Sequence, residues 1–154
     1  MAERAAAIGS VLMSPSEADT LLAAAWLHDI GYVPALQTTG FHPLGGARYL
    51  AAHGWPETII ALVAHHSGAD YLAAVRGLDR QLADFPPQLG PVDDALTYAD
   101  QTIGPDGEPM TLDQRIAEML RRHGPDSPNA AANPRREPAV REAVRRVERR
   151  LARR

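Results

Sequence analysis

Four short motifs place histidine and aspartate side chains where helices are expected to begin or end. They are HDIG at 28–31, HP at 42–43, HH at 65–66 and the single aspartate at position 100 of TYADQT. Neighbouring residues in mid-helix diverge by about 100° of rotation, whereas neighbours at a helix end can both be aimed at one point. Each motif alone has an ordinary explanation, such as a helix cap. The four together, in a helical chain, predict a metal site.

The side chains of these motifs are imidazoles and carboxylates, a ligand set that suits Fe, Mn, Zn, Co or Ni, with Mg at the oxygen-rich side. The chain has no cysteine, so a thiolate metal site, a cysteine nucleophile and a disulfide framework are excluded. A carboxylate such as Asp29 can bridge two ions about 3.5–4 Å apart, and such a pair supplies hydroxide at neutral pH and binds a phosphoryl group for in-line attack. Asp29 is therefore the predicted catalytic residue.

The order HD, HP, HH and Asp resembles the HD-domain superfamily of metal-dependent phosphohydrolases. More narrowly, HDIG, HPLGGARYL and HHSGAD resemble the HD-GYP branch and related small bacterial HD proteins. The resemblance covers about residues 1–123 and implies an all-α bundle of five or more helices around one or two divalent metal ions. It implies that one ion is bound by His28, Asp29 and Asp100, and a second by Asp29, His42, His65 and His66.

The chain departs from the family pattern in three places. No histidine precedes His28, and Glu3 is the only carboxylate ahead of the helix that carries HDIG. Our hypothesis is that Met1 falls inside a longer native helix, so that the first helix is truncated and a ligand lies upstream. Tyr32 stands where the HD-GYP branch often has lysine, and no Gly-Tyr-Pro signature follows HHSGAD. Cleavage of cyclic dinucleotides is therefore not predicted.

Two residues that lie between the HDIG and HH motifs, Thr39 and Arg48, are predicted to bind substrate. Arg48 lies on the helix that Pro43 starts, and its planar guanidinium suits a phosphate group. Thr39, in the loop 38–40, offers a hydroxyl at the rim of the site; simple turn chemistry is the alternative explanation. Asp70 either orients a ligand histidine or caps the next helix.

Caps and apolar spacing predict helices along nearly the whole chain. Ser16 with Asp19 is expected to open the helix that carries HDIG and ends at Gly31. Further helices are expected at 43–54, 56–65, 91–103 and 111–124. Residues 124–137 read as a Pro-rich linker, and 138–154 as a basic amphipathic helix. The predicted organisation is thus an HD domain over 1–123, a linker, and a tail helix that docks on the body or on a partner chain.

Charge is unevenly distributed. Residues 135–154 hold nine Arg and three Glu, which gives this segment a net charge of +6. Since the whole chain has a net charge of −3, residues 1–134 have a net charge of −9. An acidic body is not typical of a nucleic-acid-binding domain. The apolar runs are too short to span a membrane, and the N-terminus is a poor signal peptide, so a cytoplasmic location is expected. A homo-oligomer or a partner contact through the tail helix is a further expectation.

Motifs and resemblance together predict a metal-dependent phosphohydrolase that acts on a small phosphorylated molecule, a nucleotide or a phosphate ester. Two alternatives stay open. Some HD relatives use a di-iron centre to activate oxygen, and an imidazole and carboxylate ligand set permits that chemistry as well. A degenerate HD domain without catalysis, binding a nucleotide or a protein partner, would account for the missing upstream ligand.

Overall fold

The computed structural model describes residues 1–154, which form helices joined by short loops, with one isolated bridge between Ile103 and Pro109 and no strand. The α-helices are α1 (Ala2–Leu12), α2 (Pro15–Leu27), α3 (His42–Ala52), α4 (Glu57–His65), α5 (Ala69–Val75), α6 (Asp79–Leu82), α7 (Pro91–Gln101), α8 (Leu112–His123) and α9 (Pro128–Leu151). Three 3-10 turns are η1 (Ile30–Tyr32), η2 (Pro34–Leu36) and η3 (His66–Gly68). The predicted all-α fold of five or more helices is confirmed. None of these helices combines the length and the apolar character needed to cross a membrane.

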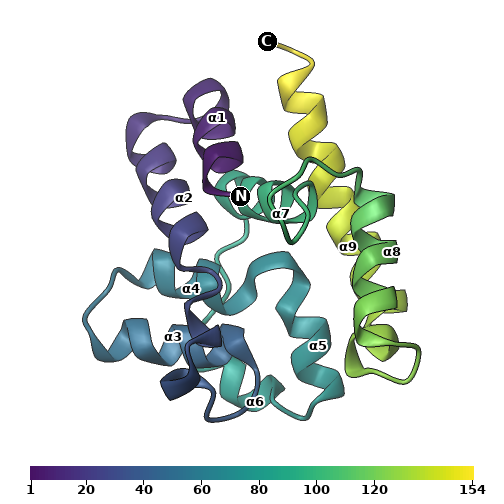
Figure 1. The fold of residues 1–154 in the computed structure, drawn as a ribbon. Helices are drawn as coiled ribbons and strands as arrows, with labels where there is room; N and C mark the ends of the chain where they lie inside the picture. The colour runs from purple at the N-terminus through teal and green to yellow at the C-terminus, as the bar shows by residue number, and fades with distance from the viewer.

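The helices form two packed groups (Figure 1). Helices α1 and α2 lie side by side and pack on α7, which α9 also contacts. Their apolar side chains form one cluster, centred on residues such as Leu21 and Leu96. Helices α3 to α6 surround a second cluster, which includes Phe41 and Val63. The C-terminal ends of α2, α4 and α7 and the start of α3 carry the four histidine and aspartate motifs to the boundary between the two groups.

Helix α2 begins two residues earlier than predicted and ends four residues earlier. The cap is Ser14 rather than Ser16: its hydroxyl accepts from the backbone N–H of Glu17, and the Glu17 carboxylate accepts from the backbone N–H of Ser14 at 2.9 Å. Pro15 favours this start because a missing N–H costs little at the first helical position. The helix ends at Leu27, before Gly31, because the chain tightens into η1. The capping box predicted for Thr111 and Gln114 does form.

Gly31 serves close packing rather than helix termination. A Cβ atom at Gly31 would collide with the backbone carbonyl of His42 and would lie 2.8 Å from the backbone nitrogen of Gly46. Because glycine has no Cβ, η1 can lie directly against the first turns of α3. This contact brings Asp29, which precedes η1, beside His42, which opens α3.

The predicted linker at 124–137 is wrong, and the predicted tail helix starts too late. Helix α9 runs unbroken from Pro128 to Leu151 with Pro134 and Pro138 inside it. Both prolines are exposed, so water can reach the backbone carbonyls that lack a helical N–H partner. The opposite face is buried against α5 and α7, and this packing outweighs the weak helix propensity of the proline-rich sequence.

The apolar stripe of α9 docks on the body of the same chain, one of the two roles predicted for it. Val140, Val144 and Val147 are all buried. At the polar edge of the stripe, Arg146 and Arg150 donate to the buried carboxylate of Asp94 on α7, with the shortest N–O distance 2.6 Å. The stripe is therefore covered by α7 and α5 within one chain.

Candidate metal centre

Three ligand atoms from separate segments converge at the boundary of the two helix groups. They belong to Asp29, His42 and His66, and all lie within 4.8 Å of one another. His42 Nε2 is 3.2 Å from His66 Nε2 and 3.3 Å from Asp29 Oδ1. Asp29 follows α2, His42 opens α3 and His66 follows α4. Residues at three helix ends thus aim their side chains at one point, as the sequence motifs predict.

Two further predicted ligands complete this group. His28 Nε2 lies 3.3 Å from Asp29 Oδ2 and 3.7 Å from Asp100 Oδ1, at the last turn of α7. We call His28, Asp29, His42, His66 and Asp100 the cavity cluster. It contains five of the six predicted metal ligands, and Asp29 is the member whose carboxylate oxygens lie near all three imidazoles.

Backbone hydrogen bonds fix two of the imidazole rings. The Nδ1 atoms of His28 and His66 lie 2.9 Å and 2.7 Å from the carbonyl oxygens of Ala25 and Val63. A carbonyl only accepts, so each Nδ1 carries a proton and donates it. In the neutral ring the Nε2 atom then keeps its lone pair, and it faces carboxylate oxygens or another imidazole nitrogen. Lone pairs facing one another across about 3 Å repel unless a proton or a cation lies between them, so these donors fit a divalent metal ion.

The close approach of these imidazole and carboxylate groups shifts their pKa values. Burial and then the neighbouring His28 and His42 lower the pKa of His66 to about 3. Burial also lowers the pKa of His28, but the hydrogen bond with Asp29 and the charge of Asp100 outweigh it, so that pKa is raised. Burial raises the pKa of Asp29, yet His28 and His42 hold it well below its usual range. The surroundings therefore favour a proton on His28 and disfavour one on His66.

Asp100 is positioned by a strained turn. Its Oδ2 accepts from the Ser67 hydroxyl at 2.5 Å and from the Gln101 side chain at 2.7 Å, leaving Oδ1 toward His28. Ser67 adopts φ 54°, the only non-glycine residue with positive φ. Such a conformation costs of order 1 kcal/mol and persists where surrounding contacts enforce it. Here the Ser67 carbonyl accepts from Arg136 Nε at 2.7 Å, so α9 helps to hold the turn after His66.

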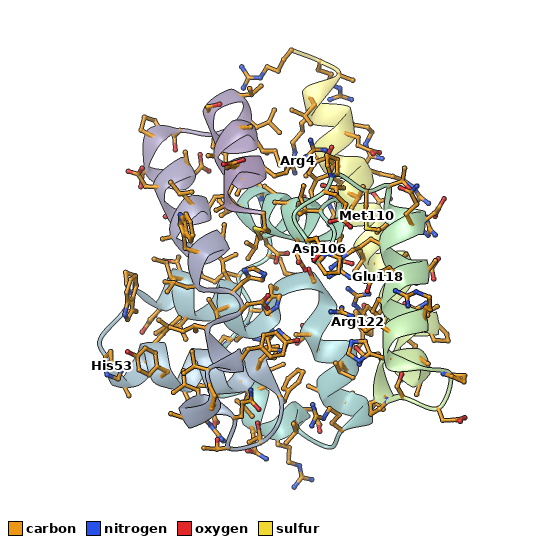
Figure 2. The ribbon with its side chains drawn as sticks, in the orientation of Figure 1. Arg4, His53, Asp106, Met110, Glu118 and Arg122 are labelled. Carbon is orange, nitrogen blue, oxygen red and sulfur yellow. The ribbon has the colours of Figure 1, made fainter.

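The cavity cluster lines a cavity of about 530 Å³. Three arginines line the same cavity: Arg115 and Arg122 from α8, and Arg136 from α9. Figure 2 shows Glu118 and Arg122 on the side of α8 that faces the middle of the molecule. The cavity therefore combines potential metal ligands with guanidinium groups, which bind phosphate well. Met1 lines it too; the hypothesis of an upstream ligand stays a prediction.

His65, the sixth predicted ligand, does not join the cavity cluster. Its Nδ1 lies 2.7 Å from Asp70 Oδ1, and its Nε2 contacts the carbonyl oxygen of Phe85. Both partners are acceptors, so each ring nitrogen faces a protein oxygen, and the protonated ring donates to both of them. Burial lowers the pKa of His65, but the Asp70 and Phe85 hydrogen bonds outweigh it and raise that pKa. The prediction fails because α4 ends between His65 and His66, which turns the two rings apart.

The two predicted substrate ligands also lie elsewhere. Arg48 is exposed on α3 and donates to the side chain of Gln81 at 2.7 Å. The Thr39 hydroxyl accepts from the backbone N–H of Phe41, and the Thr39 carbonyl accepts from Arg76. These hydrogen bonds fix the loop before α3. Neither residue lines the cavity. Arg48 lies past the first turn of α3, where the helix rotation has turned its side chain away from His42.

Sequence reasoning missed the arginines of α8 and α9. Arg115, Glu118 and Arg122 follow a spacing of three and four residues, which places them on one helix face; this signal was available. Arg136 fell inside the segment predicted as a linker. Tyr32, noted in the sequence as a departure from the family pattern, has its ring stacked on His42 with centroids 4.0 Å apart and lines the cavity.

Comparison with known proteins adds no relative to this description: no protein-family model, curated protein or solved structure matches the chain.

Proposed function

We propose that the chain is a metal-dependent phosphohydrolase that acts on a small phosphorylated molecule, a nucleotide or a phosphate ester, and that it is a divergent HD-type protein. The observation that carries this proposal is the cavity cluster itself, with imidazole nitrogens and carboxylate oxygens that converge from four helix ends on the wall of a cavity. The arginines that line the same cavity favour an anionic substrate.

In this proposal His28, Asp29, His42, His66 and Asp100 hold one or two divalent ions. Such an ion supplies Lewis-acid polarisation of a phosphoryl oxygen and acidifies water near neutral pH. The chain's own residues prepare that chemistry. Val63 and Ala25 hold two rings in the tautomer that leaves Nε2 free, and Asp29, whose pKa is held well below its usual range, is ionised and able to bind an ion.

The proposed substrate enters over Tyr32, whose exposed ring covers one face of His42. The guanidinium groups of Arg115 and Arg122 attract the phosphate across the cavity. A cytoplasmic location belongs to the same proposal, and the absence of cysteine is compatible with it.

The test is metal content and turnover on one preparation. The chain is stripped, reconstituted separately with Mn²⁺, Fe²⁺, Co²⁺, Ni²⁺, Zn²⁺ and Mg²⁺, and assayed by mass spectrometry and against p-nitrophenyl phosphate and a panel of nucleotides. We expect at least one ion per chain and metal-dependent phosphate release, both lost in Asp29→Ala. Arg48→Ala, at an exposed residue on α3 outside the cavity, is the control and retains both.

Two outcomes contradict the proposal. Absence of bound metal after every reconstitution would refute a metal centre. Bound metal with no phosphate release from any substrate, but oxygen consumption by the iron form, would favour the oxygenase instead.

A further inference from the structure

The arginine side of the cavity has more positive charge and more free donors than one metal-bound phosphate needs. We propose that Arg115, Arg122 and Arg136 form a second anion site that binds a second phosphate of the substrate without the metal. This inference rests on the proposed function and narrows it, because it makes the substrate a small molecule with two phosphate groups. We call these three residues the arginine wall.

Unused hydrogen-bond donors support a ligand at this wall. Arg115 Nε is buried and has no hydrogen-bond partner. Arg122 meets Glu118 Oε1 through its Nε at 3.2 Å, and no hydrogen bond of the structure uses its two terminal nitrogens. A buried donor without a partner, such as Arg115 Nε, costs roughly 1–3 kcal/mol, so it is rare unless something else binds it. The terminal nitrogens of Arg122, whose side chain is 47% exposed, are open to a ligand from the solvent side.

Glu118 orients two arginines of the wall but neutralises only one of their charges. Its carboxylate accepts from Arg115 at 2.7 Å and contacts Arg122, and its side chain is only 11% exposed. One carboxylate thus orients two guanidinium groups and neutralises one of them. Arg136 donates only to neutral groups, the carbonyl of Ser67 and the side chain of Gln101. Three arginines minus one glutamate leave the wall with a net charge of +2.

The charge of the cavity cluster makes the +2 of the arginine wall informative. Asp29 and Asp100 carry −2 in total, and the histidines add no charge when they bind metal as neutral rings. One divalent ion therefore neutralises the cavity cluster and leaves the +2 of the arginine wall unmatched. A phosphate dianion matches that charge, and guanidinium groups bind it in a forked geometry. The cavity of about 530 Å³ falls in the range of small-molecule sites and far exceeds one phosphoryl group.

Inorganic pyrophosphate binding to the metal-stripped chain tests the wall directly. The full chain is passed over a chelating resin, and binding is measured by calorimetry for the wild type, Arg122→Gln and Arg121→Gln. We expect binding to the wild type, and weakening by about tenfold or more in Arg122→Gln, because a charge-assisted hydrogen bond is lost. Arg121 is the matched control: it is the preceding residue on α8, carries the same charge and is exposed like Arg122, but it does not line the cavity.

Three results are informative in different ways. No binding to the stripped wild type, or equal weakening in both variants, overturns the second anion site. Recovery of part of the affinity in Arg122→Lys, with helical circular dichroism unchanged throughout, supports a specific contact over a folding defect. Metal-dependent phosphate release is measured separately. A chain that hydrolyses p-nitrophenyl phosphate but fails to bind pyrophosphate refutes only the arginine wall, and the reverse result refutes only the hydrolase.

Discussion

His65 and His66 are neighbours in the chain, but their rings belong to two different regions. His66 points into the cavity cluster, where its Nε2 lies 3.2 Å from His42 Nε2 and 4.0 Å from Asp29. His65 points to a separate corner, where it donates to Asp70 and to the carbonyl of Phe85. We call this second region the His65 corner. Both regions combine imidazole with carboxylate, and composition alone does not separate them.

The difference lies in what the ring nitrogens meet. In the His65 corner each ring nitrogen faces a protein oxygen, so the protonated ring has an acceptor for each of its two N–H groups. In the cavity cluster the outer nitrogens face other electron-rich atoms, and only a proton or a cation can satisfy all of them. The raised pKa of His65 and the pKa of about 3 for His66 are two expressions of that contrast. A metal site is therefore recognised by its unmatched lone pairs more than by its count of histidines.

The same substitution at the two neighbours gives the largest expected difference. We expect His66→Gln to weaken Mn²⁺ or Zn²⁺ binding by at least about 100-fold, since loss of even an outer-sphere partner costs 10- to 100-fold. His65→Gln should leave metal affinity within about threefold but lower the melting temperature, because two hydrogen bonds of a buried ring are altered. Calorimetric titration and thermal denaturation measure the two quantities. Equal loss of metal in both variants would make His65 a ligand and erase the distinction.

Proton competition is the next effect. The raised pKa of His28 means that its ring holds a proton up to a pH above 6.5, and a metal ion must displace it. Apparent metal affinity should therefore fall by about tenfold per pH unit on acidification below that pKa, for one displaced proton. Titrations at several pH values, in buffers of different ionisation enthalpy, count the protons released.

In the metal-free chain, His28 and His66 make the free energy of unfolding depend on pH. Because the His28 pKa is raised, its contribution to the free energy of unfolding is full below pH 6.5 and is lost as pH rises through the raised pKa. His66 acts in the opposite direction: with a folded pKa of about 3, it lowers stability as pH falls from 6.5 toward 3.

A metal affinity independent of pH between 5 and 8 would contradict the assignment of His28 as a ligand.

Gly31→Ala tests the packing that brings Asp29 to His42. The added Cβ would collide with the His42 carbonyl, so η1 must move away from α3. We expect metal affinity to fall by about tenfold or more, since a misplacement of an ångström is enough to disrupt such a site. Gly54→Ala is the control: Gly54 has φ 70° with open space around it, so alanine there strains the backbone without touching the site. A similar loss of metal in both variants would point to general destabilisation.

Much of the fold was predictable because its signals are local. The capping box at Thr111, the prolines that start α3 and α7, and the spacing of Val140, Val144 and Val147 all act within a few residues. Helix α9 shows the limit of such reasoning. Pro134 and Pro138 disfavour a helix locally, and only burial of the opposite face against distant helices overrides them.

The site residues also divide into those that local sequence signals predict and those that only the folded chain reveals. His28, Asp29, His42, His66 and Asp100 were predicted because helix ends can be located from sequence, and these ends meet. The orientation of His65 depends on a single backbone turn after α4, which residue types do not encode. The arginine wall combines residues from α8 and α9 whose partners lie up to 69 positions away in the chain, so only the folded chain shows that they face the cluster.

The smallest expected effect concerns Asp70, the carboxylate of the His65 corner. Asp70 is half exposed, so Asp70→Asn should cost only roughly 1 kcal/mol, or about 2–4 °C in melting temperature. The His65 pKa is raised, so the stabilisation from this pair is full below pH 6.5 and disappears as pH rises through that raised value. The wild type and Asp70→Asn should therefore differ at pH 6 and converge at pH 9, while metal affinity stays within about threefold at both. A tenfold loss of metal affinity in Asp70→Asn would mean that His65 reaches the metal after all, with Asp70 behind it as an orienting partner. The two regions would then be one extended site.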